Sequence, residues 1–342
     1  MPKKNETFLE RLIDKYGEEV VELGEDVKDI TNIKVIRTGS TSLDVSLGVG
    51  GVPLGRITTV YGPESSAKTT LSLSIAKNAI EAGYNVLYVD VENALDFAYI
   101  KAVLGESFTH DRFILVQPEY AEDALTICEN GINSGEFNLI ILDSIGSLAP
   151  KKEKEDDFEK AHVAIVPRML SAFLRRNAYS IRTKNIAFVF VNQVRAVIGS
   201  YVATESMPGG NALRHFSSVI LALHKSEQIK FGDEIVGSYS RFTVKKNKLA
   251  PPFRSSRFPL IYGVGIDRAR DTVEFAEMLS VLEKRGTFYY FEGDNIGQGL
   301  AKTSDYLSNN KEVLDKIAEK CYTINSAVAH AISVEESELQ DE

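Results

Sequence analysis

The sequence predicts an α/β fold in which helices flank a mostly parallel sheet. From residue 57 onward, short continuously apolar runs alternate with segments of helical periodicity, which is typical of buried parallel strands joined by crossover helices. The first run leads into a loop, residues 62–70, whose composition suits phosphate binding at a strand-to-helix turn. The chain has 342 residues, enough for roughly two domains. An N-terminal helix and a small C-terminal α/β domain complete the predicted organisation.

The N-terminal region predicts one amphipathic helix. Five large apolar residues fall on one helical face between residues 6 and 17, and Gly17 follows as a C-cap. Such a helix can pack on its own domain or dock on a neighbouring subunit, and periodicity does not decide between the two. A short strand near residues 33–37 and a helix opening at Thr41 follow before a glycine-rich turn.

The central sheet is predicted from β-branched and aromatic runs that alternate with helical patterns. Helical segments near 72–82, 94–104, 121–134 and 166–183 separate these runs. The predicted strands are residues 57–60, 86–89, 113–116, 139–142 and 187–191, and then 219–223, 241–246 and 258–262.

The character of the sequence changes near residue 263. A helix over residues 272–285 ending at Gly286, a short aromatic strand over 287–292 and a helix over 311–321 predict a small C-terminal domain. The last residues are acidic without a base, which is typical of a disordered tail. The predicted divisions are residues 1–32, 33–264, 265–330 and 331–342.

Composition excludes several classes of protein. The two cysteines, Cys128 and Cys321, lie far apart and in no metal-ligand spacing, so neither a disulfide framework nor a zinc site is predicted. The sequence has neither an apolar signal region nor a bilayer-length apolar run, and we expect a cytoplasmic protein.

The charge is unevenly distributed along the chain. The formal net charge is -9, yet residues 161–260 carry 15 Lys+Arg against 4 Asp+Glu. A basic band on an acidic protein is either a footprint for nucleic-acid phosphates or a solvated face.

The loop after the first strand carries the clearest chemical signal. Backbone N–H groups and the positive end of a helix dipole can converge there on an anion, with Lys68 on the β- and γ-phosphates and Thr69 on Mg²⁺. Ala67 stands where G-x-x-x-x-G-K-[ST] expects its second glycine, and the alternative is a Ser-rich loop that caps a helix. The predicted phosphate-binding residues are Gly62, Pro63, Glu64, Ser65, Ser66, Ala67, Lys68, Thr69 and Thr70.

Three strand ends carry groups that suit a bound nucleotide. Asp143 follows one strand and can hold Mg²⁺ through water, although a carboxylate there can instead cap a helix. Glu92 lies just past another strand and can activate a water for attack on the γ-phosphorus. Asn192 and Gln193 end a third strand, where an amide can sense the γ-phosphate. A long loop from Arg195 to residue 210 follows, which suits either a second ligand or a mobile surface.

The chain contains six distinctive motifs: GPESSAKTT, YVDVENALDFAYI, LIILDSIGSLAPK, FVFVNQVR, PGGNALRHF and VKKNKLAPPF. In their order and approximate spacing they resemble the bacterial RecA recombinases. The resemblance extends from about Phe8 to Lys320 and includes further sequence segments outside these motifs, such as IRTGSTSLDVSLGVGGVPLGRI and NIGQGLAK. Such coverage is far more specific than a lone phosphate loop.

The resemblance implies an ATP-dependent DNA recombinase with a RecA-like P-loop core. Such a protein forms a helical homopolymer on single-stranded DNA, pairs it with homologous duplex DNA and exchanges strands in recombination and repair. The implied cofactors are ATP and Mg²⁺. The expected partners also include single-strand-binding and mediator proteins. No membrane association is expected. The SOS response belongs to the same family context.

The resemblance also implies a role for each matched residue. Lys68, Glu92 and Gln193 take catalytic positions, with Thr69 and Asp143 at the metal. Asp96 and Tyr99 contact adenine, while Lys246 and Lys248 reach the ATP of the adjacent subunit. The helix near residues 8–16 resembles the family's subunit-docking helix, and residues 155–165 and 195–210 match its two DNA loops. The implied DNA-binding residues are Arg168, Ser171, Arg175, Arg195, Gly209, Gly210 and Asn211.

The sequence departs from the family at a few positions. Ala67 replaces a glycine, Asn93 replaces a histidine, His215 replaces a phenylalanine, and the second DNA loop is about one residue short. The first DNA loop is acidic, which is expected to weaken DNA contact there. Ala67 leaves open a non-catalytic DNA-pairing mediator that uses ATP as a structural ligand. A ring helicase is the third interpretation.

Overall fold

The computed structural model describes residues 7–16, 33–155, 165–196, 205–206 and 210–338. Residues 1–34 and 35–342 form two compact units, and each is described by itself. The first unit contains the predicted amphipathic helix, α1 (Phe8–Tyr16). A reciprocal capping box begins it, because Thr7 N–H donates to Glu10 Oε2 at 2.7 Å and Glu10 N–H donates to Thr7 Oγ1 at 3.2 Å. The predicted C-cap, Gly17, lies outside the described residues.

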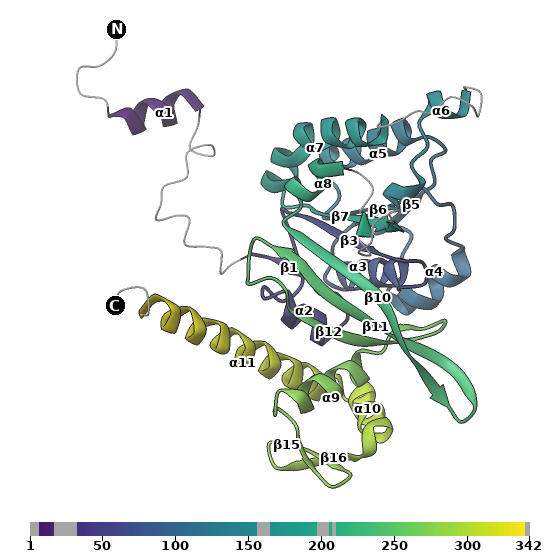
Figure 1. Cartoon of the computed structure of the whole chain (residues 1–342), viewed down its shortest axis with the longest axis vertical. Helices are drawn as coiled ribbons and strands as arrows, with labels where there is room; N and C mark the ends of the chain where they lie inside the picture. The colour runs from purple at the N-terminus through teal and green to yellow at the C-terminus, as the bar shows by residue number, and fades with distance from the viewer. Residues whose placement is uncertain (1–6, 17–32, 156–164, 197–204, 207–209, 339–342) are drawn as a thin grey trace. The chain divides into compact units, whose positions relative to one another are not determined.

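A nine-stranded sheet forms the centre of the second unit, in the order β13-β12-β11-β10-β3-β7-β6-β4-β5 (Figure 1). The six strands from β10 to β5 are parallel, and the other three add antiparallel neighbours at one edge. The predicted mostly parallel α/β fold is therefore confirmed. The strands are β3 (Ile57–Gly62), β4 (Val86–Asp90), β5 (Phe113–Val116), β6 (Leu139–Asp143), β7 (Ala187–Gln193), β10 (Val219–Phe231), β11 (Glu234–Asn247), β12 (Ser255–Ile261) and β13 (Gly265–Ile266).

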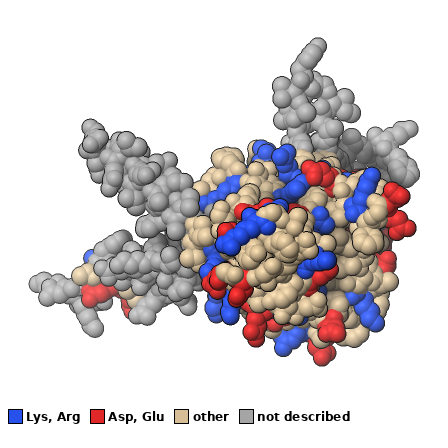
Figure 2. Space-filling view, turned by 90° about the horizontal axis from the view of Figure 1, so that it is seen from below, with Lys and Arg blue, Asp and Glu red and all other residues tan. Residues whose placement is uncertain are grey.

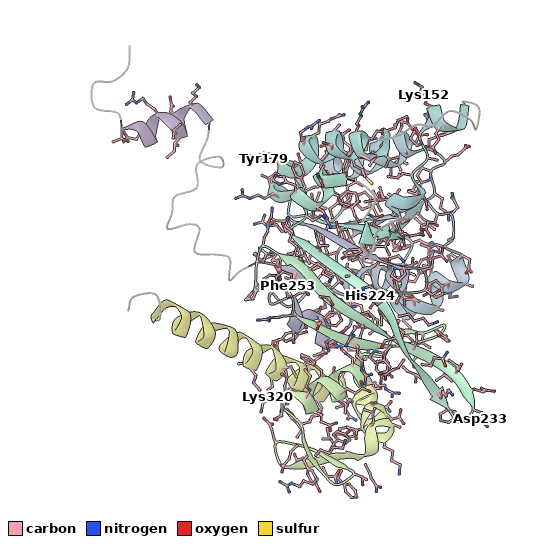
Figure 3. The ribbon with its side chains drawn as sticks, viewed as in Figure 1. Lys152, Tyr179, His224, Asp233, Phe253 and Lys320 are labelled. Atoms are coloured by element: carbon pink, nitrogen blue, oxygen red, sulfur yellow. The ribbon has the colours of Figure 1, made fainter. Side chains whose placement is uncertain are left out.

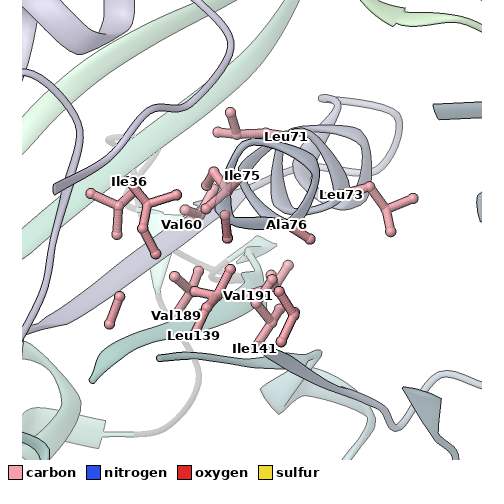
Figure 4. Packing of buried hydrophobic residues seen from close by; sticks show 14 of the residues in the cluster. Ile36, Val60, Leu71, Leu73, Ile75, Ala76, Leu139, Ile141, Val189 and Val191 are labelled. Carbon is pink, nitrogen blue, oxygen red and sulfur yellow. The ribbon is translucent and has the colours of Figure 1, made fainter. Parts of the chain in front are cut away.

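Helices cover both faces of the sheet. On one face, α3 (Lys68–Glu81) and α4 (Phe97–Leu104) pack in a core that includes Leu71, Ile75 and Val189 (Figure 4). On the other, α5 (Ala121–Ser134) and α7 (Ile165–Thr183) pack over Phe188 and Phe190. These four helices correspond to the predicted ones, and burial on both faces explains why the parallel strands read as continuous apolar runs.

Short elements connect this framework. They are β1 (Val35–Ile36), α2 (Thr41–Ser46), β2 (Val52–Pro53), 3-10 helices at Gly105–Ser107 and Ile145–Ser147, α6 (Lys151–Glu155), β8 (Arg195–Ala196), β9 (Glu205–Ser206) and α8 (Gly210–Phe216). In the described part of the chain, no helix is both long and apolar enough to cross a membrane.

Strands β10 and β11 form a hairpin much longer than the predicted strands at 219–223 and 241–246. Its distal end projects beyond the sheet, with Asp233 at the tip (Figure 3). Side chains there are largely exposed, and Phe231 is 81% exposed. The hydrophobic pattern ended early because hairpin pairing, rather than burial, holds this part together.

The C-terminal domain corrects one predicted helix. The sequence predicts a helix over 272–285, whereas α9 (Arg268–Met278) ends earlier and residues 283–285 form a strand. Ser280 has a φ of +56°, which breaks the helix before that strand. The remaining elements are β14 (Glu283–Arg285), β15 (Phe288–Phe291), β16 (Asp294–Gln298), α10 (Gly299–Asn309) and α11 (Lys311–Glu338).

Helix α11 also differs from prediction, because it continues to Glu338 where the sequence predicts a disordered tail from residue 331. Alanine and glutamate in this stretch favour helix. Residues 339–342 lie outside the described residues.

Figure 2 shows basic and acidic side chains interspersed on the face seen from below.

A buried carboxylate joins the C-terminal domain to the core. Asp271 accepts hydrogen bonds from Ser42 Oγ at 2.7 Å and Ser40 Oγ at 2.9 Å. Burial raises the pKa of Asp271 to about 6, and these hydrogen bonds oppose that shift.

Candidate nucleotide and nucleic-acid site

The phosphate loop connects β3 to α3 at the carboxyl ends of the parallel strands. A Cβ on Gly62 would lie 2.2 Å from the carbonyl oxygen of Leu223, so the close approach of the neighbouring strand β10 requires glycine here. Ser240 Oγ donates to the Ser66 carbonyl at 2.9 Å and holds the loop against β11. The Ser66 hydroxyl itself is buried and has no hydrogen-bond partner among the described residues. An anion in the loop would satisfy such a donor.

Ala67 has the backbone conformation that the missing glycine would adopt freely. Its φ is +73° and its ψ is 22°, in the left-handed region, and Lys68 begins α3 immediately afterwards. A Cβ in this region costs about 1–2 kcal/mol. The loop therefore keeps its shape despite the alanine, at a cost in strain.

We expect Ala67→Gly to increase the free energy of unfolding by up to about 1 kcal/mol, because relief of the left-handed strain exceeds the greater entropy of glycine in the unfolded chain. Urea unfolding without nucleotide measures the change. Ala82→Gly is the matched control: Ala82 ends the same helix with a φ of -78°, so the substitution there should destabilise. Equal destabilisation at both positions would contradict the strain at Ala67.

Lys68, Thr69 and Asp143 converge beneath this loop. Lys68 Nζ donates to the Pro63 carbonyl at 2.7 Å, and burial lowers the pKa of Lys68, with the charges of Asp143 and Glu92 opposing the shift. Thr69 Oγ1 donates to Asp143 Oδ2 at 2.8 Å. Lys68 is thus a cation that lines the same pocket as the Thr69 hydroxyl and the Asp143 carboxylate.

Asp143 is held by side chains rather than used as a helix cap. Tyr88 donates its hydroxyl to Asp143 Oδ2 at 2.8 Å, as Thr69 does from the other side. Burial raises the pKa of Asp143 to about 6. No cluster of three acidic, histidine or cysteine ligands occurs in the described ranges. One hydroxyl and one carboxylate suit Mg²⁺, which typically takes one or two protein ligands and completes its octahedron with water and phosphate oxygens.

Glu92 and Gln193 are in direct contact, although 101 positions separate them. Gln193 Nε2 donates to Glu92 Oε1 at 2.6 Å, and Ser144 Oγ donates to the same oxygen at 2.5 Å. Both side chains line the pocket formed by the phosphate loop and Asp143. The predicted water-activating group and the predicted γ-phosphate sensor therefore form one unit.

Sequence reasoning missed two groups that position Glu92. Ser144 is one of them. Asp90 is the other: its Oδ1 accepts from Glu92 N–H at 3.1 Å and its Oδ2 accepts from Leu95 N–H at 3.1 Å. The only sequence signal for Asp90 was its position at a strand end.

The two predicted adenine contacts lie at the start of α4. Asp96 caps this helix by accepting from Tyr99 N–H at 2.7 Å, and the Tyr99 hydroxyl lies 2.6 Å from Thr70 Oγ1. These residues border the phosphate loop without lining the pocket beneath it. Their contact with adenine stays a prediction.

A second pocket brings together most of the predicted DNA-binding residues. Arg168, Ser171 and Arg175 on α7 line it with Gly210 and Asn211 at the start of α8. Arg175 Nη1 donates to Ser171 Oγ at 3.1 Å. Gly209, the side chain of Arg195 and most of both predicted DNA loops lie outside the described residues.

Lys246 and Lys248 contact α8 rather than the nucleotide pocket of their own chain. Lys246 Nζ donates to the carbonyls of Arg214 at 2.6 Å and His215 at 3.2 Å, and Lys248 Nζ donates to His215 O at 3.3 Å. Burial lowers the pKa of Lys246, and the charge of Lys248 adds to that shift. Both ammonium groups stabilise the negative C-terminal end of α8.

Comparisons with known proteins agree with this geometry. The RecA N-terminal domain model matches residues 3–267, and the RecA C-terminal domain model matches residues 271–323. The match to the C-terminal domain argues against a ring helicase.

Two curated relatives match most of the chain. The chain is 40% identical over 346 residues to the RecA protein of Ectopseudomonas oleovorans, covering 99% of this chain and 98% of the relative. It is 38% identical over 317 residues to the RecA protein of Bifidobacterium breve, covering 92% and 80%. Among solved structures, a RadB recombinase aligns with a TM-score of 0.52 and 24% identity, covering 68% of this chain and 98% of that chain, which supports the fold.

Proposed function

This chain belongs to the RecA family and is an ATP-dependent DNA recombinase of recombination and repair, and we propose that it acts as a polymer on single-stranded DNA in which each nucleotide site is completed by the next copy. Pairing with homologous duplex DNA and strand exchange follow from this proposal.

One observation carries the proposal: the two pockets are close together in the sequence, because Gln193 of the nucleotide pocket precedes Gly210 of the second pocket by 17 positions. We call the second pocket, lined by Arg168, Ser171, Arg175, Gly210 and Asn211, the arginine pocket. Gln193 ends β7 in contact with Glu92, and the chain then continues to α8, whose first residues line the arginine pocket. We propose that a change at Gln193 when the γ-phosphate arrives or leaves is passed along the chain to residues that hold nucleic-acid phosphates.

The nucleotide pocket supplies the groups that phosphoryl transfer to water needs. Lys68 and the Ser66 hydroxyl hold phosphate oxygens at the positive end of α3. Thr69 and Asp143 would hold Mg²⁺, which would supply positive charge to offset that of the phosphates. Glu92 orients a water and accepts its proton, while Gln193 and Ser144 keep the carboxylate in place.

The arginine pocket holds DNA without reading its sequence. Arg168, Arg175 and the backbone of Gly210 present donors suited to phosphate, so strand pairing supplies the specificity. Phosphate release and electron microscopy, with and without single-stranded DNA, test the proposal. Helical filaments with a slowly hydrolysed ATP analogue, and ATP hydrolysis stimulated by DNA, are the expected results. A purified protein that neither binds DNA nor responds to it, with or without nucleotide, would overturn the proposal.

We expect Lys246→Gln combined with Lys248→Gln to reduce DNA-stimulated hydrolysis at least tenfold, because each charge-assisted contact to a phosphate is worth about 1.5–3 kcal/mol. Phosphate release measures the loss. Lys245→Gln is the matched control, since Lys245 is exposed on the same strand and, among the described residues, makes none of the contacts with α8 that Lys246 and Lys248 make.

Mixing variants tests whether these lysines act on a neighbouring copy. The double lysine variant retains Glu92, and a Glu92→Gln variant retains the lysines. In a mixed polymer, about one interface in four combines both intact halves, so activity should exceed that of either variant alone. Mixtures as inactive as the separate proteins would show that the lysines act within their own chain.

A further inference from the structure

Phe253 is an exposed aromatic residue held in a fixed position. It lies between β11 and β12, is 73% exposed and has a φ of +68°. Its N–H donates to the Val244 carbonyl at 2.7 Å, while Val244 N–H donates to the carbonyl of Arg254 at 2.9 Å. Pro251 and Pro252 precede it and restrict the backbone further. A bulky residue that is both strained and exposed is uncommon and points to a use for its side chain.

A second aromatic feature lies beside the base end of the nucleotide site. Phe97, 55% exposed at the start of α4, packs edge-on against Phe108 with ring centroids 5.3 Å apart. His110 lies parallel to Phe97 at 6.3 Å. We call Phe97, Phe108 and His110 the aromatic patch. Phe97 directly follows Asp96 and shares α4 with Tyr99, whereas Phe108 and His110 lie beyond the end of that helix.

The two features lie on opposite sides of the second unit. Phe253 is at the left in Figure 3, whereas α4 is at the right in Figure 1. The sheet order agrees, because β11 and β4 lie on opposite sides of its central strands. Two different surfaces that meet head to tail produce an open polymer rather than a closed dimer.

The stretches of sequence that carry the two features differ in charge balance. Residues 235–266 carry six Lys+Arg and no Asp or Glu. Residues 92–111 carry four Asp+Glu and one lysine. Opposite charge steers two such surfaces together and sets their register.

We propose that Phe253 of one copy packs on the aromatic patch of the next copy. This inference rests on the proposed function, since Lys248 lies five residues before Phe253 and the same stretch of chain would bring both to the neighbour's nucleotide site. The phenylalanine then covers the base end of the site while the lysines reach its phosphate end. Aromatic stacking supplies a contact between copies that does not depend on the phosphates.

Cross-linking tests this contact directly. One variant carries Phe253→Cys and another carries Phe97→Cys, while the native Cys128 and Cys321 are buried. A short bis-maleimide added to the mixture on single-stranded DNA with a slowly hydrolysed ATP analogue should give covalent dimers. A chain with both substitutions should give a ladder of multimers. Tyr179→Cys replaces Phe253→Cys in the control, because Tyr179 is 59% exposed on α7 and lies away from the proposed contact.

Electron microscopy of the same samples distinguishes failure of the Phe253 contact from failure of the proposed function. Filaments with a ladder support the inference. Filaments without a ladder, or with as much cross-linking from Tyr179→Cys, overturn the inference and leave the proposed function intact. Absence of filaments from the wild-type chain overturns the proposed function itself. Phe253→Ala is further expected to raise the protein concentration needed for assembly at least fivefold, and an unchanged threshold would contradict the contact.

Discussion

Replacing Glu92 by glutamine is expected to reduce DNA-stimulated ATP hydrolysis by about 10²–10⁴-fold, the usual contribution of a general base. Glutamine keeps an oxygen that can accept from Gln193 and Ser144, so the pocket should keep its shape while losing the proton acceptor. Nucleotide binding should change little. Phosphate release measures the loss, and a fluorescent ATP analogue measures the binding.

Glu64→Gln is the matched control for this experiment. Glu64 lines the same pocket but is exposed and makes neither of the contacts of Glu92 with Gln193 and Ser144, so the substitution removes the same charge without removing the proposed base. Hydrolysis by Glu64→Gln should stay within a few-fold of the wild type. If both variants lose activity equally, the effect is electrostatic and Glu92 is not the base; if neither does, the base is another group.

The sequence predicted the parallel part of the sheet well because burial on both faces leaves an unambiguous signal. The runs at 139–142 and 187–191 are continuously apolar, and the structure places both in the centre of the sheet. The distal half of β10 and β11 lacked that signal, because its residues pair in a hairpin while facing solvent. A pattern of hydrophobicity detects burial rather than strand pairing.

The nucleotide pocket was predictable in its members but not in their contacts. Glu92 and Gln193 each followed a predicted strand, and the adjacency of β7, β6 and β4 brings their ends together. Strand order is a tertiary property, so the hydrogen bond between them could not be read from spacing. The left-handed conformation of Ala67 was also hidden, since alanine gives no sequence signal for it.

The lysines show a further limit of sequence reasoning. Their motif pointed to a nucleotide on another copy, whereas the structure shows them on the last carbonyls of α8. Both arrangements use the positive charge of the lysines: in the structure it stabilises the negative end of α8, and in the proposed polymer it would contact phosphates. A lysine that leaves α8 for a phosphate would weaken the C-terminal end of the helix whose other end lines the arginine pocket.

Replacing Arg168 and Arg175 together by alanine is expected to weaken single-stranded DNA binding and to flatten its salt dependence. Each phosphate contact on a single strand contributes about -0.7 to the slope of log affinity against log salt, so loss of two contacts should flatten the slope by about 1.4. Titrations at several salt concentrations, with oligonucleotides of different sequence, measure this slope. The loss should be the same for every sequence, because phosphate contacts carry no base information.

Arg176→Ala is the control for that charge change. Arg176 follows Arg175 on α7 but is directed to Glu129, with 2.9 Å between Nη2 and Oε1, and it does not line the pocket. Its removal should leave the salt slope nearly unchanged. A slope that falls equally for Arg176→Ala would indicate that DNA responds to the overall charge of the helix. An unchanged slope in the double variant would place the DNA outside the pocket that α7 forms with the start of α8.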